Sequence, residues 1–230
     1  MTEAADGTIP TNLPAAVLFD MDGTLVDSER VWAIALRELA REYGGELSEP
    51  ARLAMIGGDM ASSMAILHAE VGQPWRDVAA SAAWLERRVT ALFRTELEWR
   101  PGARALLAAT KQAGIPTALV TNTERALAEV ALDAIGREWF DVVVVGDEVP
   151  ATKPHPAPYL TAARLLGVPI GRCVAVEDSP VGVASAHAAG AVVLAIPHDA
   201  VVDAREGVHL LESLTGADLH LLSRLAGSLP

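Results

Sequence analysis

The stretch "AAVLFDMDGTLVDSERVW", residues 15–32, decides the fold that we expect for this chain. An apolar run ends at Phe19 and is followed by two aspartates, Asp20 and Asp22. Short apolar runs without alternation are typical of strands that helices cover on both faces. In a regular strand, residues two apart share a side. Both carboxylates would then enter one small volume at the end of a buried strand.

Four similar apolar runs recur along the chain, with amphipathic segments between them. The five runs are Ala16 to Phe19, Thr117 to Val120, Val142 to Val145, Cys173 to Val176 and Val192 to Ile196. The helical segments Ala103 to Ala113 and Ala126 to Ala134 end near Gly114 and Gly136, and glycine commonly follows the last residue of a helix. Alternating strands and helices predict an α/β fold with a doubly wound, Rossmann-like parallel sheet.

One interval breaks this alternation, because residues 31–99 contain no strand-like run. Apolar side chains recur there at helical spacing, first from Trp32 to Tyr43 and again from Trp75 to Leu92. Roughly seventy residues are too many for a crossover but sufficient for a small helical domain. We therefore predict an all-α cap at 31–99, inserted into a discontinuous core of residues 15–30 and 100–230.

Composition excludes several classes of protein. The net charge of −12 argues against a nucleic-acid partner, since phosphate backbones are bound by clustered Lys and Arg. No apolar run is long enough to span a bilayer, so we expect no membrane partner. Residues 1–14 are polar and lack a secretion-signal pattern, which predicts a disordered lead-in. The only cysteine, Cys173, lies in an apolar run, and we expect a core residue and a reducing, cytoplasmic location.

Polar and charged side chains follow four of the predicted strands. The residues are Asp20, Asp22 and Thr24, with Gly23 between them, after the first, Thr121 and Asn122 after the second, Lys153 downstream of the third, and Glu177, Asp178 and Ser179 after the fourth. Ligands of open α/β sheets bind beyond the carboxyl ends of the strands, so these residues would gather at one edge. Several carboxylates repel one another unless a cation lies among them, and oxygen ligands favour Mg²⁺.

This set of residues predicts phosphoryl transfer. Mg²⁺ and Lys153 would neutralise the charge of a phosphate, which allows a carboxylate to approach the phosphorus atom. An aspartate nucleophile divides a difficult hydrolysis into two steps through an acyl phosphate. Thr121 and Asn122 would donate hydrogen bonds to the phosphate oxygens.

Four ordered motifs, "DMDGTLVDSE", "VTN", "KPHPAPYL" and "VEDSPVGVASAHAAG", resemble those of the haloacid dehalogenase (HAD) superfamily. The resemblance extends to the subfamily that includes phosphosugar phosphatases and β-phosphoglucomutase, and the inserted helices resemble the cap of that subfamily. It implies a Mg²⁺-dependent phosphatase acting on a small phosphorylated metabolite, with a sugar or polyol phosphate as the expected substrate. Subfamily habit and the acidic composition also favour a monomer.

The resemblance implies a role for each matched residue. Asp20 would be the nucleophile that forms an aspartyl-phosphate. Asp22 would protonate the leaving oxygen and then activate water, and its backbone carbonyl would be a metal ligand. Asp178 would bind the metal together with Asp20, and Glu177 would do so directly or through water.

Phosphate binding and substrate contacts are implied in the same way. Thr121 and Lys153 match the phosphate-binding pair of the family. In relatives, a cap loop and the hinge beside the first motif face the substrate, which makes Glu29, Gly57 and Gly58 candidates for substrate contacts.

Simpler structural roles are open for some residues of these stretches. Asp27 can cap a helix, with Glu29 in its first turn. His155, within "KPHPAPYL", and His68, in a predicted cap helix, are both expected at the surface.

Other functions remain as alternatives. A β-phosphoglucomutase carries a cap histidine ten residues after the second aspartate, whereas this chain has Trp32 there, which cannot transfer a proton. Hydrolysis is therefore favoured over a mutase. Dehalogenation requires neither a metal nor an acid at Asp22. The non-enzyme alternative is a phosphorylation-switch domain, but such domains carry no helical insertion.

Overall fold

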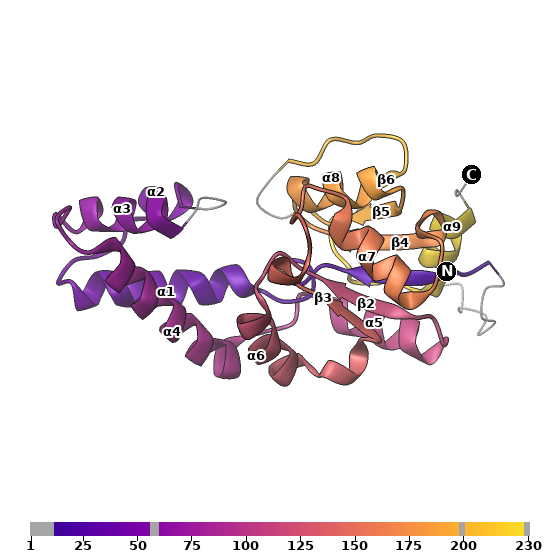
Figure 1. Cartoon of the computed structure of the whole chain (residues 1–230), viewed down its shortest axis with the longest axis horizontal. Coiled ribbons are helices and arrows are strands. Elements are labelled where there is room, and N and C mark those ends of the chain that lie inside the picture. Colours follow the sequence, from indigo (N-terminus) through magenta and orange to yellow (C-terminus); the bar gives the residue numbers. More distant parts are fainter. Residues whose placement is uncertain (1–11, 56–59, 198–200, 228–230) are drawn as a thin grey trace, which may run out of the picture. The chain divides into compact units, whose positions relative to one another are not determined.

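Figure 1 shows the chain as a computed structural model, which describes residues 12–55, 60–197 and 201–227. The chain divides into two compact units. One is an insertion of residues 27–98, and the other is assembled from the segments that end at Val26 and resume at Trp99. We describe each unit by itself.

Part of the sequence-based prediction lies outside the described residues. This holds for Gly57 and Gly58 and for residues 1–11 of the predicted lead-in. Pro14, the last residue of that lead-in, is described and is buried. The next residue, Ala15, donates its backbone N–H to the carbonyl of Arg172 at 2.8 Å.

Six parallel strands form the sheet of the first unit. They are β1 (Ala16–Phe19), β2 (Thr117–Val120), β3 (Val142–Val144), β4 (Cys173–Glu177), β5 (Val192–Ala195) and β6 (Val208–Leu210). Their order is β3-β2-β1-β4-β5-β6, so β1 lies between β2 and β4. This order is that of a doubly wound sheet, which confirms the predicted fold class.

Helices follow the strands of this unit. They are α5 (Ala103–Gln112), α6 (Arg125–Ile135), α7 (Ala157–Leu166), α8 (Pro180–Ala189) and α9 (Leu219–Gly227), with 3₁₀ turns at Arg137–Trp139, Gly146–Glu148 and Ile170–Arg172. Helix α7 contacts β1, β2 and β3, while α8 contacts β4 and β5 (Figure 1). In the described ranges, no helix is both long and apolar enough to cross a bilayer.

Alternate residues of the strands point toward α7 and α8. Leu18 of β1 and Ala175 of β4 share a buried cluster with Tyr159 of α7 and Val183 of α8. Cys173 belongs to the same cluster, which confirms the expectation of a core residue. Because strand side chains alternate, the positions two residues after Leu18 and Ala175 face the same side. These positions are Asp20 and Glu177.

The second unit consists of helices. They are α1 (Ser28–Glu42), α2 (Glu49–Leu53), α3 (Met60–Glu70) and α4 (Val78–Glu96). Helix α4 packs against both α1 and α3. Asp27 caps α1 by accepting the backbone N–H of Arg30 at 3.2 Å, as the sequence suggested. The predicted second helix is wrong at its start, because Trp75 precedes α4 and is 77% exposed.

The surface position predicted for His68 is also wrong. Its side chain is buried, and its Nε2 lies 2.8 Å from Oγ of Ser81 on α4. The hydroxyl of Tyr43 lies 2.7 Å from the same oxygen. The spacing of apolar residues in α3 did not indicate that His68 is buried, because its hydrogen-bond partner, Ser81, lies on another helix. His155, by contrast, is exposed as expected, and its Nδ1 accepts the backbone N–H of Ala157.

Candidate active site

Predicted residues meet where β1, β2 and β4 end. Asp20 directly follows β1 and continues its ladder, since its backbone N–H donates to the carbonyl of Val176 at 3.0 Å. Thr121 directly follows β2, and Glu177 is the last residue of β4. Lys153 reaches the same edge from the loop that precedes α7, as shown by its contacts with Asp20 and Glu177. The parallel sheet thus gathers these side chains at one edge, as expected.

Lys153 joins two carboxylates in the interior. Its Nζ donates to Oδ1 of Asp20 at 2.5 Å and to Oε1 of Glu177 at 2.6 Å. All three side chains are buried. Burial opposes the charge of the ammonium group, but the two carboxylates outweigh it and raise the pKa of Lys153 above its usual value. Burial also raises the pKa of Asp20, and Lys153 partly opposes this rise. The ammonium group of Lys153 therefore favours the charged form of the Asp20 carboxylate, against the effect of burial.

Asn122 holds the loop that carries the lysine. Its Oδ1 accepts the backbone N–H of Lys153 at 2.9 Å, and its Nδ2 donates to the backbone carbonyl of Lys153 at 3.2 Å. The amide group therefore fixes the loop across the end of β2. Its predicted contact with phosphate stays a prediction.

Asp22 has different partners from Asp20. Its Oδ2 accepts hydrogen bonds from the hydroxyls of Thr121, at 3.1 Å, and Thr123, at 2.7 Å. Strand β1 ends at Phe19, so the alternation of a regular strand does not govern the direction of Asp22. The two aspartates consequently lie at the same edge but in separate hydrogen-bond networks.

Three carboxylates lie close enough to hold a metal ion. Asp20, Glu177 and Asp178 each offer an oxygen, and these atoms lie within 4.8 Å of one another. Thr24 donates its hydroxyl to Oδ1 of Asp178 at 3.0 Å, which orients that carboxylate. Burial, with the charge of Glu177, raises the pKa of Asp178 to about 6. An all-oxygen donor set of this kind fits a hard divalent cation.

Gly23 allows the loop to approach this cluster. Its φ of +79° is in the left-handed region, and a Cβ atom there would lie 2.2 Å from Oδ2 of Asp178. A side chain would therefore displace one of the candidate ligands. The backbone carbonyl of Asp22 as a metal ligand stays a prediction, as does the substrate-facing role of Glu29, which lies in the first turn of α1.

Sequence reasoning missed two residues that support this site. Tyr159 is fully buried and donates its hydroxyl to Oε1 of Glu177 at 2.5 Å. Thr123 is the second donor to Asp22. The "KPHPAPYL" motif contains Tyr159, and Thr123 directly follows "VTN". Both signals were present, but only the packing of α7 on the sheet reveals that the phenol reaches β4.

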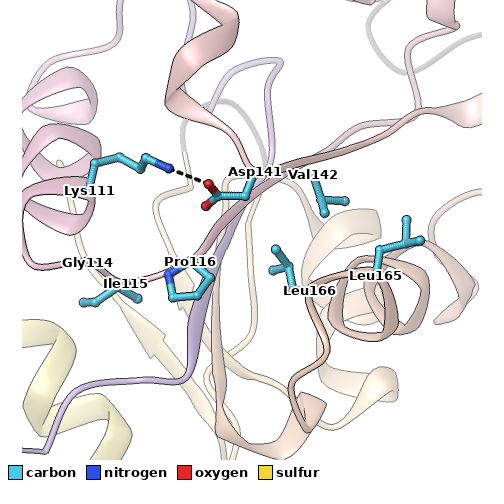
Figure 2. A pocket seen from close by; sticks show the side chains of 8 residues that line it. All are labelled: Lys111, Gly114, Ile115, Pro116, Asp141, Val142, Leu165 and Leu166. Atoms are coloured by element: carbon cyan, nitrogen blue, oxygen red, sulfur yellow. Dashed lines mark hydrogen bonds and ion pairs between the residues drawn. The ribbon is translucent and has the colours of Figure 1, made fainter.

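A separate pocket lies at the other edge of the sheet (Figure 2). Its volume is about 420 Å³, and its lining includes Pro116, just before β2, and Asp141, just before β3. Lys111 closes one side through an ion pair with Asp141 at 2.7 Å, drawn as a dashed line in Figure 2. The remaining lining residues are Gly114, Ile115, Val142, Leu165 and Leu166. None of the candidate catalytic residues lines it, so the acid cluster and not this pocket is the candidate active site.

Comparisons with known proteins identify similar sequences and structures. A sequence profile described as haloacid dehalogenase-like hydrolase matches residues 14–190. Hexitol phosphatase A of Escherichia coli (strain K12) is 39% identical over 183 residues, which are 78% of this chain and 81% of that protein.

Two solved structures are similar over nearly their whole length. CbbY from Rhodobacter sphaeroides in complex with phosphate is 29% identical with a TM-score of 0.73, and the match covers 91% of this chain and 99% of that one. A putative β-phosphoglucomutase from Thermotoga maritima is 26% identical with a TM-score of 0.75, covering 94% and 99%.

Proposed function

Because the chain belongs to the haloacid dehalogenase-like hydrolase family and is a phosphatase, we propose that it hydrolyses a small sugar or polyol phosphate with the help of Mg²⁺. The reaction proceeds through an aspartyl-phosphate on Asp20. The observation that carries the proposal is the buried Asp20 carboxylate, held by Lys153 at 2.5 Å beside Glu177 and Asp178.

Asp20 is the nucleophile. One of its carboxylate oxygens forms a bond to phosphorus while the bond from phosphorus to the leaving oxygen breaks. Lys153 balances negative charge at this point, because its ammonium group is buried and its pKa is raised by its carboxylate partners. Thr121 and Asn122 lie at the end of the neighbouring strand and add hydrogen bonds to the phosphate. For this, Thr121 turns its one hydroxyl hydrogen from Asp22 to a phosphate oxygen, while Thr123 still donates to Asp22. Asn122 uses the amide hydrogen that it does not donate to the carbonyl of Lys153.

Asp22 transfers the protons. It donates one to the leaving oxygen and later accepts one from the water that hydrolyses the aspartyl-phosphate. Thr121 and Thr123 both donate to Oδ2 of Asp22. We therefore assign the proton transfers to the other oxygen, Oδ1.

The acid cluster fits Mg²⁺. Asp20 and Asp178 would bind the ion, with Glu177 bound directly or through water and the backbone carbonyl of Asp22 as a further ligand. When bound, a divalent cation neutralises phosphate oxygens and makes the phosphorus atom more electrophilic.

One observation supports the substrate class, and another supports hydrolysis as the reaction. The relative with 39% identity is named a hexitol phosphatase. Trp32 stands where the mutase pattern has a histidine, which favours transfer of the phosphoryl group to water over its return to a sugar. We also propose that the protein is a cytoplasmic monomer that binds neither nucleic acid nor membranes.

A screen of phosphorylated metabolites, with and without added Mg²⁺, tests the proposal. We expect Mg²⁺-dependent release of phosphate from sugar or polyol phosphates. Asp20→Asn should lower turnover by at least about 1,000-fold, because the amide is a poor nucleophile. Asp133→Asn is the matched control, since Asp133 is exposed on α6, and it should leave turnover unchanged.

If turnover survives in Asp20→Asn, the assignment of Asp20 as the nucleophile is refuted. Interconversion of hexose phosphates without release of phosphate would instead establish the mutase alternative.

A further inference from the structure

We propose that Tyr159 is a positioning residue for this phosphatase. Its hydroxyl fixes the orientation of the Glu177 carboxylate. In this orientation, Oε1 of Glu177 holds the ammonium group of Lys153 next to Asp20. The inference rests on the proposed function, because it explains how the charge of Lys153 is held in place for phosphoryl transfer.

A continuous hydrogen-bond chain joins the phenol to the nucleophile. The hydroxyl of Tyr159 donates to Oε1 of Glu177 at 2.5 Å. Lys153 Nζ donates to the same oxygen at 2.6 Å and to Oδ1 of Asp20 at 2.5 Å. The ammonium nitrogen also lies 5.2 Å from the centroid of the Tyr159 ring. The phenol therefore acts on Lys153 through Glu177.

The other contacts of Glu177 leave its orientation to Tyr159 and Lys153. Ser179 donates to Oε2 of Glu177 at 3.4 Å, a long hydrogen bond. Gly182 of α8 provides room, since a Cβ atom there would lie 1.9 Å from Oε2. On the α8 side, the backbone at Gly182 lies close to the carboxylate and limits its position. On the α7 side, Tyr159 is an uncharged donor that forms a short hydrogen bond with it.

The hydroxyl is not needed to fill space. Tyr159 is fully buried in the cluster under α7, where a phenylalanine ring would occupy the same volume. A buried phenol requires a hydrogen-bond partner, and this one has a carboxylate. Removing the hydroxyl leaves a buried carboxylate short of one donor, so Glu177 and Lys153 would adopt other orientations.

The chain offers a matched pair of variants, because it contains two tyrosines. Tyr159→Phe should lower kcat about 10-fold, the lower end of the effect of removing a supporting hydrogen bond behind a metal or catalytic ligand. KM should change less than about 2-fold, because the phenol is buried behind Glu177. Tyr43→Phe removes a hydroxyl that contacts Ser81 in the helical unit and should leave both constants unchanged.

A double-mutant cycle with Glu177→Gln separates positioning from packing. If Tyr159 acts through Glu177, Tyr159→Phe should change kcat less than about 2-fold in the Glu177→Gln background. An equal loss in both backgrounds would overturn the proposal, as would a wild-type kcat in Tyr159→Phe alone.

Urea unfolding of the same four proteins gives a readout that does not depend on turnover. Non-additive shifts of the unfolding midpoint would support the contact between Tyr159 and Glu177, and additive shifts would overturn it. Absence of phosphatase activity in the wild-type protein would instead refute the proposed function, and the unfolding cycle would still decide on the contact.

Discussion

Gly23 and Gly44 have nearly the same φ angle but very different surroundings. Their φ angles are +79° and +76°. A Cβ atom on Gly23 would lie 2.2 Å from Oδ2 of Asp178, whereas one on Gly44 would meet no heavy atom of the described residues within 4 Å. Alanine at either position carries the cost of a left-handed conformation, about 1–2 kcal/mol. Only Gly23→Ala also displaces a candidate metal ligand.

Gly23→Ala should therefore impair the site beyond its cost in stability. We expect turnover to fall at least about 10-fold and the Mg²⁺ concentration for half-maximal activity to rise, because Asp178 must move. Gly44→Ala should lower the free energy of unfolding by about 1 kcal/mol and leave the Mg²⁺ dependence unchanged. Steady-state kinetics over a Mg²⁺ titration and urea unfolding provide the measurements. Equal kinetic constants for the two variants would contradict the crowding argument.

At the residue scale, the sequence predicted charged groups better than neutral donors. Asp20 and Glu177 stand at strand ends in the sequence, Lys153 lies downstream of another strand, and the three meet in the structure. Tyr159 was not predicted, because a buried tyrosine in a helix reads as an apolar core residue. Its role depends on which strand α7 covers, which no local pattern encodes.

At the element scale, α1, α3 and α4 meet around a buried histidine. His68 of α3 lies 2.8 Å from the hydroxyl oxygen of Ser81 on α4, which Tyr43 at the end of α1 also contacts. Arg76 lies over the ring of Tyr43, 3.4 Å from its centroid. Burial lowers the pKa of His68, and the charge of Arg76 lowers it further, while Asp77 opposes this shift. The neutral imidazole is therefore the form that the helical unit accommodates.

The helical unit should lose stability in acid. A histidine in the unfolded chain has a pKa of about 6.5, and the folded pKa of His68 is lower. The unfolded state thus binds more protons, and the stabilisation present above about pH 6.5 is lost as the pH falls toward and below the folded pKa. Urea unfolding between pH 7.5 and 5 should show this decrease.

His68→Gln should flatten the pH dependence, because glutamine does not titrate. His155→Gln, at an exposed position, should leave the dependence unchanged. A wild-type slope in His68→Gln would show that other groups cause the loss.

Short elements were the least predictable ones. Strand β6 contains three residues at the edge of the sheet, one of them exposed, and it was not predicted. It is a strand because its backbone pairs with that of β5, and its sequence contains no distinct apolar run. Helices α1 and α5 were predicted because each has a sustained apolar face.

At the scale of the whole molecule, the insertion leaves the sheet unit and returns at adjacent positions. Val26 forms an antiparallel bridge with Trp99, and the backbone N–H of Arg100 donates to the carbonyl of Leu25 at 2.8 Å. Within the helical unit, the N–H of Asp27 donates to the carbonyl of Glu98 at 2.9 Å. A short linker can therefore span both ends of the insertion.

A variant in which a Gly-Ser linker replaces residues 27–98 should retain a folded sheet unit. The six strands and their helices all lie outside that range, so we expect cooperative urea unfolding and a native-like circular dichroism spectrum. Hydrolysis of p-nitrophenyl phosphate should persist, while discrimination among phosphorylated metabolites should fall, because the proposed cap residues are gone. A chain that is unfolded without the insertion would contradict the independence of the sheet unit.

The sequence by itself determined the fold class and the edge of the sheet where the acids gather. Apolar runs and helical spacing are local signals, and the carboxyl ends of parallel strands necessarily share one edge. Only the tertiary structure decided which oxygen each donor contacts, that Asp22 turns to two threonines, and that Tyr159 and His68 are buried with polar partners. These contacts join residues far apart in the chain. Burial and hydrogen-bond partners depend on the packing of whole elements, which local sequence patterns do not specify.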